Sequence, residues 1–391
     1  MEEIIALAIG LIAGVISGIV PGIHSNTVAQ FFDSVFKDPI LLGIAIIAAT
    51  SVQTVLSFLP SIFLCIPESS TLLSVLPGQR MLKEGKGLLA IQISSFSALI
   101  ALLASIVLIP LFFILIPNLY SIIRPVMAPV LTLICIALIL QEKEISKIWK
   151  ALFVFSLAGI FGFILLSGPI LNEPLFTTFV GLFALSNLIT TAKNVEIPTQ
   201  HQPRKIDIKD FLPIILVGVL LGSVADIFPV LNSSAQMATF GSILTGADPG
   251  KFLSLTMSIS VSHSFSSLAA LYTINKARTG SVALIQENQP GIELNIILMY
   301  MIVAVIGVAV ASVLLIFLSK YFVKLINSVN LPVLNLIILL YLAAAVLLVD
   351  GIPGILVCIV ATSIGILPIL WGIRRTHTMG FLLIPALIYL W

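Results

Sequence analysis

Charged residues are scarce in this sequence: 9% of its 391 residues are Asp, Glu, Lys or Arg, whereas 59% are hydrophobic. A chain with so little charge lies outside the composition of water-soluble domains. The net charge is only +2, and the basic residues are spread among many segments, which argues against a nucleic-acid partner. The composition therefore predicts a protein whose main solvent is the lipid bilayer.

Cysteine is also rare, and Cys65, Cys135 and Cys358 lie singly in apolar stretches without the spacing of a metal site. The sequence contains no Walker motif, no nucleophile elbow and no His-Glu-His metal motif. We therefore expect no catalytic residues, no resident metal and no cofactor. These absences argue against an enzyme and against a pump that hydrolyses nucleotides itself.

Apolar runs of about 17 to 25 residues recur along the chain, and each is long enough to cross ~30 Å of hydrocarbon as a helix. A transmembrane strand would instead alternate apolar and polar residues, and the run 98–110 shows no such alternation. The predicted fold class is an all-α polytopic membrane protein. We place it in the cell membrane as a multi-pass protein.

One polar segment, residues 192–210, divides the chain into two halves of nearly equal length. We interpret it as a cytoplasmic linker between a first membrane repeat, 1–191, and a second one, 211–391. The apolar runs lie at 40–66, 90–118, 126–141, 151–168 and 174–191 in the first half and at 252–274, 293–318, 332–349, 353–371 and 377–391 in the second. Each half thus holds about five spans.

Each half also opens with a segment that proline, glycine and small polar residues interrupt, at 4–36 and at 211–248. The shared residues are Gly14, Gly18 and Pro21 in the first half and Gly218, Gly222 and Pro229 in the second. Farther along, the segment that begins at Ser51 matches the segment that begins at Ser260. This pairing predicts an internal repeat of one interrupted or re-entrant helical hairpin and about five transmembrane helices.

The positions of lysine and arginine indicate that the two repeats have opposite orientations. With the linker in the cytoplasm, the basic loops at 78–87 and 142–150 also fall on the cytoplasmic side, as do Lys320 with Lys324 and Arg374 with Arg375. The N-terminus and the segment 33–38 fall outside. The counterpart of 78–87, near 276–291, then lies outside, where Lys276 and Arg278 are exceptions to the positive-inside rule. Inverted repeats are common in secondary carriers, because oppositely oriented halves give outward-open and inward-open states of similar energy.

A polar cluster follows the proline break in each opening segment, and its residues are suited to begin a new short helix. Exposed N–H groups and the positive dipole end make such a helix start attractive to an anion. We predict that the two tips face each other near the midplane with the anion between them. The predicted substrate-binding residues are Gly22, His24, Ser25, Asn26, Thr27, Ser69, Ser70, Asn232, Ser233, Ser234 and His263. The alternative is that the breaks are self-capped kinks that serve packing.

Glu68 and Asp226 are acidic residues in apolar surroundings, and we predict that one of them binds a coupling proton or Na⁺. Helix capping is the alternative for both. His24 and His263 are either donors to the anion or packing residues, whereas His201 and His377 are expected to be ordinary loop residues. The serine-rich run 258–267 predicts either a polar cavity wall or close helix packing.

The pattern Gly14-xxx-Gly18-xx-Pro21-Gly22, the second break at 66–71 and the Pro77–Gly87 loop together resemble the large membrane subunit of tripartite tricarboxylate transporters, the TctA family. The latter half departs from the family pattern, because Pro229-Val230 stands where a second Pro-Gly is usual. The resemblance implies transport of a tricarboxylate, with a small membrane subunit and an external binding protein as partners. It leaves the oligomeric state open, a homodimer included.

Three functions remain open at this point. The first is a secondary carrier of a small organic anion of the polycarboxylate type. A weaker resemblance of the turn after Pro21 to membrane carriers of polyprenyl phosphate keeps a translocase of lipid-linked phosphate as the second. A membrane scaffold that transports nothing is the third, but a scaffold has little need for interrupted helices in both halves.

Overall fold

A computed structural model describes residues 1–20, 25–64, 66, 71, 74–142, 144–168, 170–191, 198–201, 207–227, 237–238, 248–277, 279–328 and 331–391, and within these residues all regular structure is helical. The helices of the first half are α1 (Glu2–Ile19), α2 (Ser25–Val35), α3 (Pro39–Leu56), α4 (Phe58–Leu64), α5 (Val75–Lys83), α6 (Gly87–Ile123), η2 (Arg124–Val126), α7 (Met127–Leu140), α8 (Ile145–Leu166), α9 (Pro174–Phe179), η3 (Val180–Leu185) and α10 (Ser186–Thr191). Those of the second half are η4 (Ile208–Asp210), α11 (Leu212–Val224), η5 (Ala225–Ile227), α13 (Pro249–Ile274), α14 (Gly280–Asn288), α15 (Leu294–Ser328), α16 (Leu331–Trp371), η6 (Arg375–Met379) and α17 (Gly380–Leu390).

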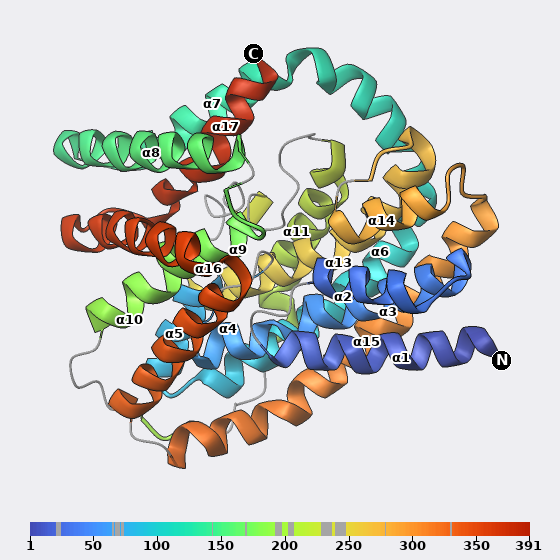
Figure 1. The fold of residues 1–391 in the computed structure, drawn as a ribbon, viewed down its shortest axis with the longest axis horizontal. Coiled ribbons are helices and arrows are strands. Elements are labelled where there is room, and N and C mark those ends of the chain that lie inside the picture. The colour runs from blue at the N-terminus through green and yellow to red at the C-terminus, as the bar shows by residue number, and fades with distance from the viewer. Residues whose placement is uncertain are drawn as a thin grey trace.

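Six helices in the described residues are long and apolar enough to cross a membrane. The helical membrane class is therefore confirmed, and the apolar runs coincide with helices. Two helices extend well past their predicted spans, since α6 reaches Ile123 and α15 reaches Ser328. The predicted spans 332–349 and 353–371 both lie in α16, which bends at Gly351, a residue with non-helical φ of 65° and ψ of −156° (Figure 1).

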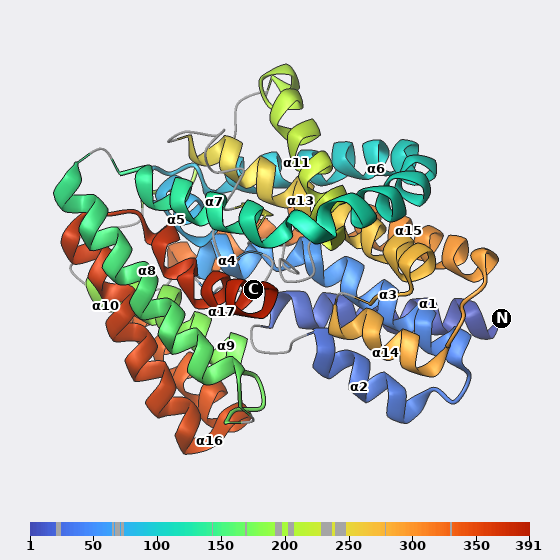
Figure 2. The same ribbon diagram turned by 90° about the horizontal axis from the view of Figure 1, so that it is seen from above.

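The helices form two packed groups that lie side by side (Figure 2). One group is built around α3, α6, α13 and α15, with α1, α2, α11 and α14 packed against it. The other contains α7, α8, α16, α17 and the continuous stretch α9–η3–α10. Many large apolar side chains on the outside of both groups are exposed, among them Ile12, Leu348 and Leu356. Such a surface is what lipid-facing helices need.

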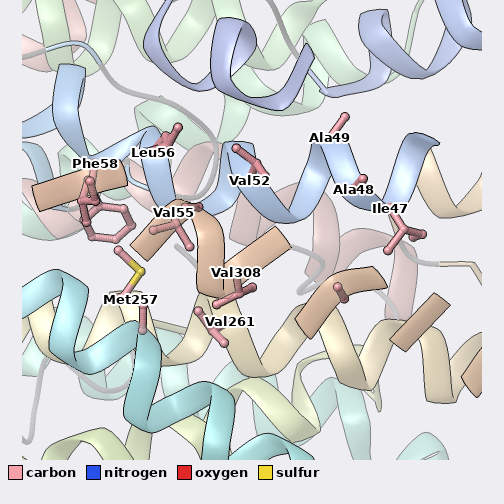
Figure 3. Packing of buried hydrophobic residues seen from close by; sticks show 14 of the residues in the cluster. Ile47, Ala48, Ala49, Val52, Val55, Leu56, Phe58, Met257, Val261 and Val308 are labelled. Atoms are coloured by element: carbon pink, nitrogen blue, oxygen red, sulfur yellow. The ribbon is translucent and has the colours of Figure 1, made fainter. Parts of the chain in front are cut away.

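Helix α3 is buried on most of its surface, with α1 on one side and α13 and α15 on the other. Figure 3 shows Ala49 and Leu56 directed toward α1, and Val55 directed toward Val308 of α15. α1 approaches so closely because its contact face is glycine: a Cβ at Gly14 would lie 2.6 Å from the carbonyl oxygen of Ala49. Small residues at such spacing allow close contact between membrane helices.

The contact between α11 and α13 repeats the contact between α1 and α3. A Cβ at Gly218 would lie 2.7 Å from Ser258 Cβ, and a Cβ at Gly14 would lie 2.7 Å from Val52 Cβ. Gly10 makes the same contact with Ala48, so the pairing of Gly14 with Gly218 stays a prediction.

Helices of the two halves also exchange partners. α3 of the first half packs against α15 of the second, and α13 of the second packs against α6 of the first. In the other group, α8 packs against α17 and α16 packs against η3. Glycines again mark both contacts, because Gly159 meets Ile384 and Gly365 meets the backbone of Leu182. In the predicted repeat, α3 with α15 and α13 with α6 are one contact with the halves interchanged.

Contacts between loops fall into two sets that match the predicted membrane sides. The linker residue Gln200 accepts a hydrogen bond from the backbone N–H of Gly87 at 2.8 Å, so the linker lies beside the loop 84–87. The backbone N–H of Arg374 donates to Glu142 at 2.9 Å. All four segments are predicted to be cytoplasmic. Segments predicted to be outside contact one another in the same way, since Asn288 donates to Asp33 at 2.9 Å.

Candidate functional site

The first predicted tip begins a helix where the sequence indicated one. α2 begins at Ser25 and runs to Val35, directly after the proline break, so the start of a short helix is confirmed there. Ser25 is half-buried and Thr27 is exposed, while Asn26 belongs to the helix by its backbone. Gly22 and His24 lie outside the described residues.

The second tip and the break after α4 cannot be compared with the prediction. Asn232, Ser233 and Ser234 lie outside the described residues, as do Glu68, Ser69 and Ser70. The opposition of the two tips and the coupling role of Glu68 therefore stay predictions. The two remaining site residues, Asp226 and His263, are described in full.

Asp226 and His263 lie in direct contact inside the protein. His263 Nε2 is 3.1 Å from Asp226 Oδ1, and the hydroxyl of Ser266 donates to Asp226 Oδ2 at 2.7 Å. The Asp226 side chain is 0% exposed and that of His263 is 10% exposed. The carboxylate thus accepts a hydrogen bond at each oxygen, as a buried acidic group requires.

Two helices bring these groups together, and the close α11–α13 contact is the reason. The hydroxyl of Ser262 donates to the carbonyl oxygen of Val219 at 2.8 Å, and the carbonyl oxygen of Gly222 lies 3.0 Å from the Ser266 hydroxyl. α11 ends at Val224, and η5 then carries Asp226 back over α13. His263 and Ser266 are three residues apart on α13, so they share one helix face.

Several serines of α13 lie at its contacts with neighbouring helices. Ser258 and Ser262 pack against the two glycines of α11, and the Ser254 hydroxyl lies 2.7 Å from that of Ser97 on α6. Ser74 donates to Thr256 at 2.9 Å. Of the two predictions for this run, close packing holds for these serines, because small hydroxyl residues both admit a near neighbour and bond to it.

Comparison with known proteins identifies the family. The model of the tripartite tricarboxylate transporter TctA family matches residues 4–380, nearly the whole chain. The chain belongs to the TctA family. The uncharacterized protein MJ1079 of Methanocaldococcus jannaschii is 28% identical over 409 residues, covering 100% of this chain and 99% of that protein. No solved structure matches the chain.

Membership of the TctA family confirms the resemblance seen in the sequence and makes this chain a membrane transporter component of a tripartite system. The family is one of transporters and not of enzymes. The family match does not favour the translocase of lipid-linked phosphate. The described helices of the TctA chain also hold two acidic sites that the sequence analysis missed.

The first missed site is Asp350, at the bend of α16. Its Oδ1 accepts from the backbone N–H of Asn172 at 2.7 Å and from that of Glu173 at 2.9 Å, and the Thr177 hydroxyl donates to Oδ2. Asp350 is 6% exposed. The carboxylate therefore caps the start of α9. An acidic residue between the apolar runs 332–349 and 353–371 was the available signal.

The second missed site joins Glu142 to the segment before α17. His377 Nε2 lies 3.0 Å from Glu142 Oε1, which also accepts from the backbone N–H of Arg374 at 2.9 Å. Burial lowers the pKa of His377 below its usual 6.5. Burial alone would raise the pKa of Glu142, but the hydrogen bonds from Arg374 and His377 outweigh it and lower that pKa below 4.5. The prediction that His377 is an ordinary loop residue was wrong.

Arg375 anchors the same segment to a π-helix. η3 is a π-helical stretch from Val180 to Leu185, and the Arg375 guanidinium donates to the carbonyl oxygen of Leu182 at 3.2 Å and to Ser186. The wide turn of a π-helix leaves carbonyl oxygens with poorer partners inside the helix. Arg375 supplies a charged donor there, which ties the start of α17 to the α9–η3–α10 stretch.

Proposed function

We propose that this TctA-family chain is a secondary active carrier of a small organic anion of the polycarboxylate type. The observation that carries the proposal is the family match over residues 4–380, whose description names tricarboxylate transport. The chain works by alternating access, in which two states expose one site to opposite sides of the membrane in turn. Energy comes from an ion gradient of Na⁺ or H⁺.

The reciprocal packing of the two halves supports this mechanism. α3 packs against α15 and α13 packs against α6, which in the predicted repeat are one contact with the halves interchanged. The basic loops predict that the two halves are inverted. In that arrangement, the change from the outward-open to the inward-open state exchanges the conformations of the two halves, so that each half then makes the contacts that the other made before. The two states then have similar energies, as an alternating carrier requires.

The substrate site of the proposal is the space between the two tips, where helix N-termini meet the anion. The start of α2 at Ser25, just after the proline break, supports one side of this site. Exposed N–H groups at a helix start attract carboxylates without a buried lysine. Asn26 and Asn232 add side-chain amides from the two sides, and Asp226 or Glu68 binds the coupling ion.

A tripartite system implies further proteins. We propose that an external binding protein delivers the anion to the outer face and that a small membrane subunit packs against the carrier. The exposed apolar surface of helices such as α1 and α16 provides lipid-facing area that a membrane subunit can share.

Uptake into proteoliposomes tests the proposal. The carrier is reconstituted with the proposed small membrane subunit and binding protein, and uptake of labelled citrate, other di- and tricarboxylates and a polyprenyl phosphate is compared under imposed Na⁺ and H⁺ gradients. We expect uptake of a polycarboxylate that one of the gradients drives. Translocation of the polyprenyl phosphate alone, or no uptake of any acid with all partners present, overturns the proposal.

The site is tested by truncating the two amides. A hydrogen bond to a charged ligand contributes about 1.5–3 kcal/mol, so Asn26→Ala and Asn232→Ala should each weaken citrate binding by roughly one to two orders of magnitude. Ser34→Ala is the matched control, because that hydroxyl donates to its own helix at Phe31. Unchanged affinity in both asparagine variants would show that the anion binds elsewhere.

A further inference from the structure

We propose that Asp226 and His263 form a single proton-binding unit, and that the proton bound there is the coupling ion. The proposal rests on the proposed carrier function and selects H⁺ over Na⁺. The distance of 3.1 Å between Asp226 Oδ1 and His263 Nε2 carries it. Ser266, which donates to the other carboxylate oxygen at 2.7 Å, completes the unit.

The unit changes its charge by one when a proton binds. In the empty state the carboxylate is charged and the neutral imidazole donates its Nε2 proton to it, so the net charge is −1. An added proton goes to Nδ1 of His263 and makes an imidazolium, which brings the net charge to zero. A buried carboxylate–imidazolium pair is better tolerated than a lone buried carboxylate, because each charge neutralises the other.

The burial of the two partners indicates where the proton enters. Asp226 is 0% exposed, whereas the His263 side chain is 10% exposed. The imidazole therefore lies between the carboxylate and the surroundings, and a proton reaches the unit through His263. A single histidine on the path allows the unit to exchange its proton without exposing the carboxylate.

The hydrogen bonds around Asp226 disfavour Na⁺. Hard cations bind to oxygen atoms that present lone pairs, but the two carboxylate oxygens of Asp226 face the ring nitrogen of His263 and the hydroxyl proton of Ser266. A Na⁺ ion would have to displace both donors.

Few other titratable groups share the elements that pack around the unit. α11 and α3 carry none in their described stretches, and α6 carries only Tyr120. The remaining ones are Lys251 and Tyr272 on α13, Arg80 and Lys83 on α5, Glu287 on α14, and Tyr300, Lys320, Tyr321 and Lys324 on α15. Tyr120 bonds to Lys276, and Lys251 and Tyr272 lie more than two helical turns from His263. Among the described residues of these elements, Asp226 and His263 are thus the titratable pair in direct contact.

The charge of the unit links the proton to the anion. An anion within the same low-dielectric region is repelled by a net charge of −1 and is not repelled by the neutral, protonated unit. Binding of the anion therefore takes up one proton, and by reciprocity the proton raises the affinity for the anion. At pH values where the Asp226–His263 pair is deprotonated in the anion-free protein, the affinity for the anion falls about tenfold when the pH rises by one.

Calorimetry of citrate binding to the purified full chain measures the linkage. Proton uptake per citrate is obtained from the heats in buffers that differ in ionisation enthalpy. Because citrate itself binds protons, wild type and variants are compared at equal pH. We expect wild type to take up about one proton more than Asp226→Asn or His263→Gln, in the presence or absence of Na⁺. Ser264→Ala, whose hydroxyl donates to Ser260 on the same helix, should match wild type.

Equal proton uptake per citrate in wild type and both variants overturns the proposal. Citrate binding that requires Na⁺, with equal proton uptake in wild type and variants, also overturns it. If wild type binds no citrate at any pH, the proposed function fails for tricarboxylates. The proton unit is then judged by NMR of ¹⁵N-labelled histidine in the free protein, with His263→Gln assigning the signal. That signal should titrate, with a midpoint that changes in Asp226→Asn and stays unchanged in Ser264→Ala. A signal that does not respond to Asp226 refutes the unit.

Discussion

Asp350 shows how much one buried carboxylate can hold together. It accepts hydrogen bonds from the backbone of two residues ahead of α9 and from the Thr177 hydroxyl. Thr177 is fully buried, so its hydroxyl has no water to bond with if the carboxylate is removed, and an unsatisfied buried donor costs about 1–3 kcal/mol. The side chain therefore fixes the position of α9 against the bend of α16.

Replacement of this carboxylate should destabilise the protein. We expect Asp350→Ala to cost about 2–4 kcal/mol, since both an N-terminal cap and a charged acceptor are lost. Thermal unfolding in detergent measures the cost. The control is Ser363→Ala on the same helix, whose exposed hydroxyl bonds only to Ile359 in the preceding turn. A melting temperature equal to that of the control would mean that the cap adds no stability.

The contact between Glu142 and His377 should make stability depend on pH. Both pKa values are lowered in the folded protein, so folding disfavours protonation of both groups. The stabilisation is complete above about pH 6.5, falls as His377 of the unfolded chain gains a proton, and falls again below about pH 4.5 for Glu142. Melting temperature against pH checks this, and His377→Gln should lose the part of the slope between these two values. An unchanged slope in that variant would assign the pH dependence to other groups.

At the residue scale, the sequence identified a buried polar residue where a charged side chain interrupts an apolar run. Asp226 was found in this way, and it is buried against His263. His377 was missed because its partner Glu142 lies in a distant loop, and nothing local marks a residue whose burial depends on another helix. The residues predicted at the tips remain predictions.

At the scale of elements, glycine decides which helices pack. The α1–α3 and α11–α13 contacts both place a glycine Cα against the backbone of the neighbouring helix. Gly14 and Gly18 are four residues apart and therefore share one helix face, although the sequence analysis used them only to pair the two halves. The exchange of partners between α3, α6, α13 and α15 was not predictable, since an apolar face does not specify which apolar neighbour it will meet.

Widening the two glycine contacts should separate the paired helices. In Gly14→Val the new side chain meets the Ala49 carbonyl oxygen, and in Gly218→Val it meets Ser258, so each should cost more than the 1–3 kcal/mol typical of overpacking. Gly168→Ala is the control, because its Cβ would meet only Ile170 at 3.8 Å. Folded yield and melting temperature report the effect. Similar values for all three variants would show that the helices can move apart at no cost.

At the scale of the whole molecule, loop contacts join segments that the basic residues predict to lie on the same side of the membrane. The linker contacts the loop after α5, and both are predicted to be cytoplasmic. Asp33 contacts α14, and both are predicted to be outside. The positive-inside rule gave these sides from residue counts alone, because orientation depends on charges near the membrane ends and not on tertiary contacts.

Accessibility of single cysteines tests the topology. In a chain without its native cysteines, we expect Lys83→Cys and Lys324→Cys to react only from the inside, and Glu2→Cys and Glu287→Cys to react only from the outside. An impermeant thiol reagent applied to intact and opened cells distinguishes the two. Reaction of position 83 from the outside would overturn the inverted arrangement.

The exchange of partners between the halves has a consequence for biosynthesis. The ribosome adds the roughly 125 residues between the end of α6 and the start of α13 in about 6–25 s at 5–20 residues per second. During this time the serine face of α6, whose later partners include Ser254 and Ser312, has no neighbour and lies in lipid or beside the insertion machinery. A nascent first half is therefore a natural target for membrane quality control until the second half arrives, and a truncated chain should be degraded instead of accumulating as a stable domain.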